Sequence, residues 1–136
     1  MTVELRDELT AAGIEQLHAL YGAEWWTSER TLPDVAEMVE NTDELVVLWD
    51  VATDELVAFA RVLTDYVYKA LIFDMIVAEP RRGRGYGRRV MERILEHPDL
   101  HDVERFELYC RGEMVPFYEQ WGFTDDTGGS RLMRRG

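Results

Sequence analysis

A short basic loop near the middle of the chain combines arginines with glycines at every second position. Residues 77–87 read Val-Ala-Glu-Pro-Arg-Arg-Gly-Arg-Gly-Tyr-Gly. Glycine lets backbone N–H groups converge at angles that other residues disfavour, and the start of a helix adds partial positive charge. The arginines reverse the charge locally, because the whole chain carries a formal net charge of -12. We therefore expect the loop to bind an anionic group.

The segments on either side of the loop predict a strand that leads directly into a helix. Before the loop, residues 70–78 are almost entirely apolar and favour a buried strand. After it, Val90, Met91 and Ile94 recur at helical spacing, and the pattern ends before Pro98. A loop between a strand and a helix N-terminus is a recurrent phosphate-binding arrangement. The alternative is a glycine-rich turn whose arginines are merely solvated.

Two common phosphate-binding motifs do not match the loop. The nucleoside-triphosphate loop ends in Gly-Lys-Ser/Thr, whereas Gly87 is followed by Arg88-Arg89 and no hydroxyl. The dinucleotide motif Gly-x-Gly-x-x-Gly follows the first strand of a repeated unit, with an acidic residue about 20 positions further on. The present loop lies past mid-chain, after two strands that are predicted to form a hairpin. Both motifs are therefore disfavoured.

The rest of the sequence predicts a single mixed α/β domain over residues 1–136. Periodicity and turn residues favour strands at residues 2–6, 44–51, 55–63, 70–78 and 105–110, with two more from Phe123 and at 131–133. Helices are predicted from Thr10 to Gly22, from Thr31 onward, over residues 85–97 and over residues 115–121. This order of elements is typical of a mixed α+β fold.

Composition limits the class of protein. The chain has 136 residues, 46% of them hydrophobic, which is enough for one domain with its own core. Cys110 is the only cysteine, so no disulfide can form within the chain, which favours a reducing compartment. The N-terminus shows no secretion signal, and no apolar run approaches the roughly 18 residues of a membrane span. We therefore predict a cytoplasmic location and no membrane partner.

The acidic charge limits the partners. With 27 acidic and 15 basic residues, the chain lacks the broad basic face that nucleic-acid binding requires. An acidic surface attracts cationic small molecules through long-range steering. Because Lys69 is the only lysine, the composition also fits a salt-adapted source or one of high GC content. Both explanations of the charge stay open.

Two motifs together resemble one known family. Arg82-Gly83-Arg84-Gly85-Tyr86-Gly87 resembles the Gln/Arg-x-x-Gly-x-Gly/Ala signature of the GNAT superfamily of acyl-CoA-dependent N-acetyltransferases. Downstream, Val115-Pro116-Phe117-Tyr118-Glu119-Gln120-Trp121-Gly122-Phe123 is similar to the second motif of that family, aromatic-Tyr-x-x-x-Gly-Phe. The separation of the motifs and the order of elements also match. An Asn that often precedes the second motif in the family has no counterpart in residues 110–113.

The resemblance implies a fold and a donor site. The implied fold is a central, mostly antiparallel, twisted sheet with one splayed strand pair, flanked by about four helices. The resemblance also implies that backbone N–H groups of the loop bind the pyrophosphate of acetyl-CoA, while the preceding strand contacts the pantetheine arm. The cofactor-binding residues implied in this way are Met75, Ile76, Val77, Arg82, Gly83, Arg84, Gly85, Tyr86 and Gly87.

Two catalytic residues are expected, an acid and a base. Tyr118 matches the family's tyrosine that protonates the leaving thiolate, and an ordinary pKa near 10 keeps a tyrosine protonated at neutral pH. A purely structural aromatic is the alternative for Tyr118. Asp74 is the candidate base, because it interrupts an apolar strand, and burial is expected to raise its pKa. Glu107 and Glu113 are weaker candidates, and a solvent-facing or hydrogen-bonded strand residue is the alternative for Asp74.

Aromatic residues near the first two helices are candidates for the acceptor site. Trp25, Trp26 and Arg30 fall in a predicted loop with Tyr21 near, and Tyr66 and Tyr68 fall between two strands. Aromatic rings supply apolar surface and attract cations, so these residues are expected to form the walls of an amine pocket. Tryptophans that only pack helices are the alternative.

The remaining reactive side chains predict no further chemistry. Cys110 ends a predicted strand and is expected to be a core residue, not a nucleophile. His18, His97 and His101 lack the spacing of metal ligands, so no metal is expected. The prediction is thus an N-acetyltransferase that uses acetyl-CoA and a small-molecule or peptide amine, with homodimer formation typical of the family. A non-catalytic acyl-CoA-binding or sensor module is the alternative.

Overall fold

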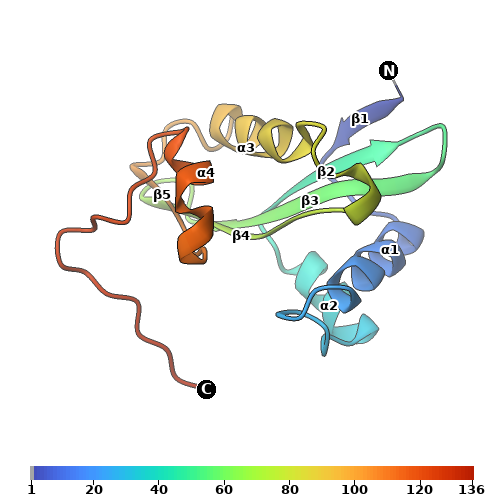
Figure 1. The fold of residues 1–136 in the computed structure, drawn as a ribbon, viewed down its shortest axis with the longest axis horizontal. Helices are drawn as coiled ribbons and strands as arrows, with labels where there is room; N and C mark the ends of the chain where they lie inside the picture. The colour runs from blue at the N-terminus through green and yellow to red at the C-terminus, as the bar shows by residue number, and fades with distance from the viewer. Residues whose placement is uncertain (1) are drawn as a thin grey trace.

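The computed structural model describes residues 2–136 and contains a five-stranded sheet with helices on both faces (Figure 1). The strands lie side by side in the order β1-β2-β3-β4-β5. Neighbours from β1 to β4 are antiparallel, whereas β4 and β5 are parallel, so the expected mixed fold with a mostly antiparallel sheet is confirmed. The strands are Val3–Arg6 (β1), Glu44–Asp50 (β2), Glu55–Thr64 (β3), Lys69–Val77 (β4) and Arg105–Leu108 (β5).

The helices form a layer on each face of the sheet. They are Ala11–Gly22 (α1), Leu32–Glu40 (α2), Tyr86–Glu96 (α3) and Val115–Glu119 (α4), with short 3-10 turns at Glu79–Arg81 and Gly112–Met114. Helices α1 and α2 cover one face, and α3 covers the other (Figure 1). Within residues 2–136, none of these helices has the length and apolarity needed to cross a membrane.

Local sequence determines where the first two helices begin. The side-chain oxygen of Thr10 accepts a hydrogen bond from the N–H of Gly13 at 3.1 Å, and that of Thr31 accepts one from Asp34 at 3.3 Å. Pro33 occupies the first turn of α2, where its missing N–H leaves no hydrogen bond unmade. Both predicted helix starts are therefore confirmed, because capping depends only on residues within one turn.

The sheet separates two hydrophobic clusters. Val90, Met91 and Ile94 of α3 pack on one face together with Tyr118 of α4. On the other face, Leu17 and Tyr21 of α1 and Val35 of α2 pack against the sheet. Because the clusters lie on opposite faces, residues of β4 that alternate in direction reach both of them.

A bulge in β4 changes this alternation at Asp74. Phe59 of β3 pairs with Ile76, and Arg61 pairs with Phe73, so Ala60 faces two residues of β4 instead of one. Asp74 has a φ of 56°, in the left-handed region, as residues in bulges often do. Strict alternation from Ile72 would direct Asp74 toward α3. The bulge instead directs its carboxylate toward α1, where it meets Tyr21.

Strands β4 and β5 separate beyond their first few residues. Their pairing covers Lys69–Ile72 and Arg105–Leu108 only, while β4 continues to Val77 alongside β3. Residues 73–77 therefore have one edge that no neighbouring strand covers. The expected splayed strand pair is confirmed, and we call the space between the diverging strands the β4–β5 opening.

The predicted strands after α4 are wrong. The segment from Phe123 onward contains no strand, and Figure 1 shows it leading away from the sheet to the C-terminus. Phe123 packs against the α3-side core, but the following residues are acidic, hydroxylated or glycine and have weak strand propensity. Leu132 and Met133 are 57% and 90% exposed, so no buried face holds this segment in register. The predicted turn at residues 127–129 is present.

Candidate active site

The glycine loop leads into α3 with its backbone donors unoccupied by side chains. Gly83 and Gly85 have φ values of 78° and 84°, which residues with a side chain rarely adopt. Gly85 caps α3, and neither a side-chain cap nor an acidic residue occupies the first turn. The first N–H groups of a helix have no partner inside the helix. The loop therefore presents backbone donors and a helix N-terminus to an anion.

Gly87 lies where the loop meets two other elements. A Cβ added at Gly87 would lie 3.5 Å from the ring of Phe117 and 3.8 Å from the side chain of Met75. These are ordinary contact distances, and Gly87 does not have a positive φ. The absence of a side chain at Gly87 is therefore not required by the protein's own packing, and it leaves room beside α4 and β4.

The arginines of the loop divide into anchored and free ones. Arg81 forms ion pairs with Asp50 at 2.8 Å and with Glu55 at 3.2 Å, and its hydrogen bond lowers the pKa of Asp50 to about 2. Arg82 donates to the carbonyl oxygen of Val77 at 3.1 Å and also pairs with Glu24. These two arginines hold the loop on the sheet.

Other arginines of the same stretch face outward. Arg88 donates to Gln120 of the α4 C-terminus and lies over the ring of Trp121. Arg84 is exposed and forms no ion pair with any residue of the described chain. The local excess of positive charge is thus partly structural, and only some of it is available to a ligand.

Tyr118 lies on α4 at the α3-side core. The side chain is 9% exposed and packs edge-on against Phe117 and Phe123, at centroid distances of 5.0 and 6.2 Å. Burial, followed by the nearby thiol of Cys110, raises the pKa of Tyr118 to about 12. Its hydroxyl makes no hydrogen bond to the described part of the chain. The Tyr118 hydroxyl is thus protonated at neutral pH, and it donates no hydrogen bond to an acceptor in the described part of the chain.

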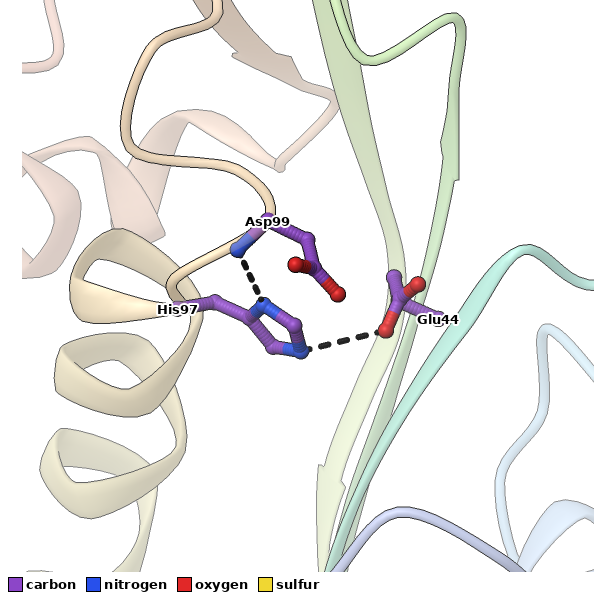
Figure 2. Close-up of side chains that lie close together, drawn as sticks. All are labelled: Glu44, His97 and Asp99. Atoms are coloured by element: carbon purple, nitrogen blue, oxygen red, sulfur yellow. Dashed lines mark hydrogen bonds and ion pairs between the residues drawn. The ribbon is translucent and has the colours of Figure 1, made fainter.

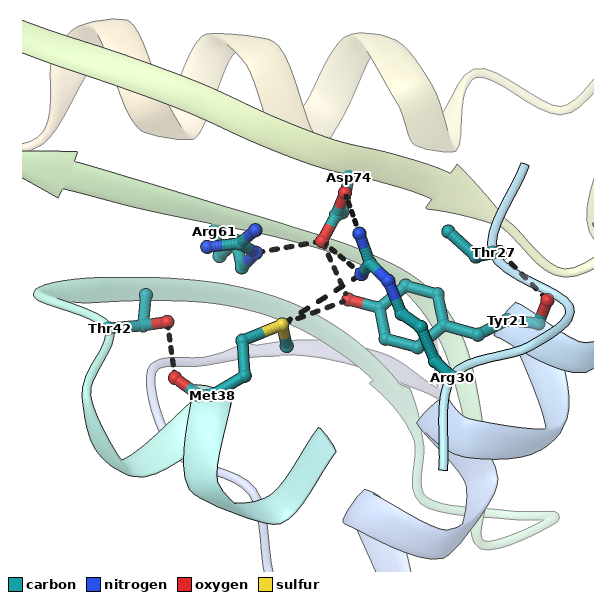
Figure 3. Close-up of polar contacts among 7 residues, drawn as sticks. All are labelled: Tyr21, Thr27, Arg30, Met38, Thr42, Arg61 and Asp74. Carbon is teal, nitrogen blue, oxygen red and sulfur yellow. Dashed lines mark hydrogen bonds and ion pairs between the residues drawn. The ribbon is translucent and has the colours of Figure 1, made fainter. Parts of the chain in front are cut away.

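Asp74 is the centre of a polar network on the α1/α2 side (Figure 3). Its Oδ2 accepts from Arg30 at 2.7 Å, from Nε of Arg61 at 2.7 Å and from the Tyr21 hydroxyl at 3.0 Å. Arg30 also reaches Oδ1 at 3.4 Å, so it binds the carboxylate in a bidentate manner. The Asp74 side chain is only 6% exposed.

The expected rise in the pKa of Asp74 is wrong. Burial alone would raise this pKa, but hydrogen bonds and charges from Arg30 and Arg61 outweigh burial and lower it. Burial, together with the same carboxylate, raises the pKa of Tyr21. Asp74 is therefore an anion at neutral pH with occupied acceptor positions, which makes it a weak proton acceptor.

The structure separates the three residues expected at the acceptor site. Arg30 belongs to the Asp74 network. Trp25 is 71% exposed, and its ring lies 5.0 Å from the guanidinium carbon of Arg111, which precedes α4. Trp26 is 42% exposed. The loop between α1 and α2 thus contacts both the Asp74 network and the segment between β5 and α4.

The network contains two residues that the sequence interpretation did not assign to it. Arg61 interrupts the apolar strand β3, as Asp74 interrupts β4, and its Nε donates to that carboxylate. Met38 of α2 contacts the network through its sulfur, 3.8 Å from Arg30 and 3.9 Å from the Tyr21 hydroxyl. A charge in a central strand is a usable signal, so Arg61 could have been found alongside Asp74.

A second cluster joins Glu44, His97 and Asp99, whose ligand atoms lie within 4.8 Å of one another (Figure 2). The backbone N–H of Asp99 donates to Nδ1 of His97 at 3.0 Å, so Nε2 carries the proton that faces Glu44 at 3.1 Å. Metal-binding histidines normally donate from the nitrogen that does not bind the metal. A metal on Nε2 would here require an imidazole without any proton. The cluster is therefore a clamp between α3 and β2.

Two further expectations are corrected or redirected. Cys110 is exposed, so the expected core position is wrong, because β5 ends at Leu108 before the cysteine. Partial desolvation of the thiol, followed by the nearby Asp125 and Glu113, raises the pKa of Cys110, which weakens it as a nucleophile. Tyr66 donates to Glu44 at 2.5 Å and so belongs to the histidine clamp, not to the Asp74 network.

Comparison with known proteins gives a consistent assignment. The acetyltransferase (GNAT) family profile matches residues 11–123. GCN5-related N-acetyltransferase 1, chloroplastic, of Arabidopsis thaliana is 29% identical over 129 residues, covering 95% of this chain and 65% of that protein. Serotonin N-acetyltransferase 2, chloroplastic, of rice is 38% identical over 77 residues, covering 57% of this chain and 38% of that protein. The chain therefore spans less than two thirds of the length of these relatives.

Solved structures share the fold over almost the whole chain. A protein from Xanthomonas campestris assigned to the GNAT family superposes with a TM-score of 0.83 at 28% identity, covering 98% of this chain and 92% of that one. Glucosamine-6-phosphate N-acetyltransferase of Arabidopsis thaliana gives a TM-score of 0.78 at 19% identity, with 100% and 99% coverage. The second likeness concerns the fold alone. Together with the profile match, the sheet opening and the glycine loop show that the chain belongs to the GNAT acetyltransferase family.

Proposed function

We propose that the protein transfers the acetyl group of acetyl-CoA to a primary amine by direct attack. The observation that carries the proposal is the β4–β5 opening together with its neighbours, because the start of α3 at Gly87 lies close both to Met75 of β4 and to Phe117, which precedes Tyr118 on α4. In this proposal the glycine loop is the phosphate site, the uncovered edge of β4 holds the extended arm, and Tyr118 is the proton donor. Family membership supports the same donor.

The donor site is built from backbone groups in this proposal. N–H groups of residues 83–87 at the start of α3 bind the pyrophosphate, with Arg84 adding an exposed positive charge. The N–H of Arg82, which the resemblance also implied, instead donates to the carbonyl oxygen of Glu79 at 3.2 Å. The uncovered edge of residues 75–77 hydrogen-bonds to the pantetheine arm. One N–H of this edge then stabilises the negative charge that develops on the acetyl oxygen.

The reaction requires one proton donor and a route for one proton away. The amine nitrogen attacks the thioester carbonyl, and the tetrahedral intermediate collapses with cleavage of the carbon–sulfur bond. Before attack, the ammonium form of the amine loses one proton to solvent. Tyr118 then gives its proton to the departing thiolate, and the cationic nitrogen of the tetrahedral intermediate returns one proton to the tyrosine through water. A pKa of about 12 keeps the Tyr118 hydroxyl protonated at every physiological pH.

Asp74 is assigned a positioning role in place of the base role. Its lowered pKa and its hydrogen bonds to two arginines leave it little capacity to accept a proton. We propose that Asp74 fixes Arg30 and Arg61 at the acceptor side. Proton removal from the amine then runs through solvent in the opening.

The test combines donor binding with turnover. Calorimetric titration of acetyl-CoA should show saturable binding, and a screen of primary amines with free-thiol detection should show transfer. Replacing Tyr118→Phe should lower kcat by about 100-fold while donor affinity changes little, because a missing general acid affects only the chemical step. Unchanged turnover and pH profile in this variant would make Tyr118 a packing residue, and binding without transfer would favour the non-catalytic module.

The cytoplasmic location and the homodimer stay predictions. The names of the two plant relatives place those proteins in the chloroplast. Cell fractionation with an antibody against this chain and light scattering of the purified protein would decide each point.

A further inference from the structure

Arg61 is held beside Phe73, the residue of β4 at which β4 and β5 begin to separate. It pairs in register with Phe73, the first residue of β4 beyond the last pair between β4 and β5. Its Nε donates to Asp74 at 2.7 Å, and its guanidinium carbon lies 4.9 Å from the centroid of the Phe73 ring. With a side chain that is 14% exposed, Arg61 has little freedom to leave this position.

The outer edge of this guanidinium has no partner in the protein. Arg61 uses only Nε toward Asp74, and its two terminal nitrogens make no hydrogen bond within residues 2–136. Arg61 lines a hollow of about 270 Å³ together with Arg30, Asp34, Val35 and Met38. The terminal nitrogens of a guanidinium form a planar fork that matches a carboxylate or phosphate group.

Charge in the hollow favours an anion on that fork. Arg30 already binds both oxygens of Asp74, so one carboxylate faces two guanidinium groups in the network (Figure 3). The remaining carboxylate of the hollow, on Asp34, is exposed on the first turn of α2, where water screens it. The buried part of the hollow therefore carries one uncompensated positive charge.

We infer that the acceptor is a small primary amine that also carries an oxyanion, a carboxylate or a phosphate, and that Arg61 binds this group. The inference rests on the proposed function. The amine end then extends toward the opening beside Phe73, while Val35 and Met38 contact the carbon skeleton. The overall acidity of the chain points to cationic partners, whereas this hollow selects the opposite charge.

The test uses acceptor pairs that differ in the oxyanion alone. Amino acids are compared with their carboxamides, and 2-aminoethyl phosphate with ethanolamine, while 1,4-diaminobutane serves as the cationic acceptor. The anionic member of a pair should be preferred by at least about tenfold in kcat/KM, as expected for charge-assisted hydrogen bonds. Comparing the carboxylate pairs with the phosphate pair identifies which oxyanion the site accepts.

Substitutions of Arg61 test whether its terminal nitrogens cause the preference for anionic acceptors. Arg61→Gln should raise KM for the anionic acceptor about tenfold to 100-fold, remove the preference and leave acetyl-CoA affinity unchanged. Arg61→Lys keeps the charge beside Asp74 but not the fork, so the fold is preserved and the preference is reduced. Arg6→Gln is the matched control, because Arg6 pairs with Glu4 on β1 and should leave every parameter unchanged. Thermal unfolding of each variant checks that the fold is intact.

Three outcomes separate this inference from the proposed function. Equal transfer to neutral or dicationic amines, or a preference that survives in Arg61→Gln, overturns the inference while the acetyltransferase assignment stands. If acetyl-CoA binds but no acceptor is acetylated, the same acceptor pairs are titrated calorimetrically into the enzyme with CoA bound, and their binding tests the inference. Binding of the anionic members that depends on Arg61 supports the inference, and no binding overturns it. Failure to bind acetyl-CoA overturns the proposed function itself.

Discussion

We proposed a donor end and an acceptor end for the site, and the two are built in different ways. The donor end consists of backbone donors from a glycine loop and a helix start, and its residues are adjacent in the sequence. The acceptor end consists of side chains, and its contacts join residues that are 13, 44 and 53 positions apart. The donor end can therefore tolerate side-chain changes that keep the backbone, whereas the acceptor end depends on each partner of one carboxylate.

This difference fits the proposed tasks of the two ends. A pyrophosphate presents many equivalent oxygens, and converging N–H groups with a helix dipole bind it without side-chain chemistry. An acceptor must be distinguished from other amines, and this requires charged or apolar groups at fixed positions. The Asp74 network supplies such positions, because burial and several hydrogen bonds restrict each member.

The largest effect is expected at the carboxylate of the acceptor end. Asp74→Asn leaves two guanidinium groups facing a neutral amide, so the free energy of unfolding should fall by about 2 to 3 kcal/mol. The value is below that for a fully buried pair, because Arg30 is 33% exposed and water screens part of its charge. Urea unfolding followed by tryptophan fluorescence measures the change.

The same variant distinguishes a positioning residue from a base. At a temperature where Asp74→Asn remains folded, kcat should persist and KM for the acceptor should rise, since Arg30 and Arg61 lose their anchor. Complete loss of kcat with unchanged stability would restore the base role to Asp74. Asp34→Asn removes an equal charge from an exposed position and should change stability by less than about 0.5 kcal/mol.

A smaller effect is expected at the backbone of the donor end. Gly85→Ala places a side chain at a φ of 84°, which should destabilise the native state by about 1 to 2 kcal/mol and weaken acetyl-CoA binding. Gly22→Ala is the matched control, because Gly22 ends α1 without a positive φ and has open space around it. The control should be neutral or slightly stabilising. Equal donor affinity in both variants would show that the loop conformation is not required for binding.

The sequence predicted the fold wherever structure depends on nearby residues. The caps at Thr10 and Thr31, the β2–β3 hairpin and the loop before α3 follow from turn and cap chemistry, and all are present. The strands after α4 were predicted from short apolar stretches alone. They fail because no core face covers Leu132 and Met133, a property of the whole fold that local patterns do not contain.

The acceptor end shows the same limit of local sequence patterns, here in the environment of a side chain. Asp74 was singled out correctly as an acid in an apolar strand, but its environment was not predictable. A bulge opposite Ala60 directs it to the α1/α2 face, where arginines from a loop and from β3 reverse the expected direction of its pKa. The charge of Arg61 within β3 was visible, yet its pairing depends on strand register. Two lone charges of opposite sign in neighbouring apolar strands are thus worth testing as a pair.

Low pH should weaken the donor end and the acceptor end by protonating a different carboxylate in each. Asp50 anchors the donor loop through Arg81, and its pKa in the folded protein is about 2, below the ordinary 3.8. Arg30 and Arg61 likewise hold the pKa of Asp74 below 3.8. A lowered pKa in the folded state contributes stability that is fully present above 3.8 and is lost as the pH falls through the folded value.

Unfolding midpoints in urea should therefore decline below about pH 4 and continue to decline toward pH 2. In Asp50→Asn and in Asp74→Asn the decline should be shallower than in the unmodified protein, since each variant has already lost one titrating pair. Acetyl-CoA affinity should weaken in acid in step with the Asp50 pair, because Arg81 holds the loop. If Asp50→Asn leaves the acid sensitivity of donor binding unchanged, the Asp50–Arg81 ion pair does not hold the donor end. The donor end would then depend on its backbone alone, and it would differ from the acceptor end even more than the ion pairs indicate.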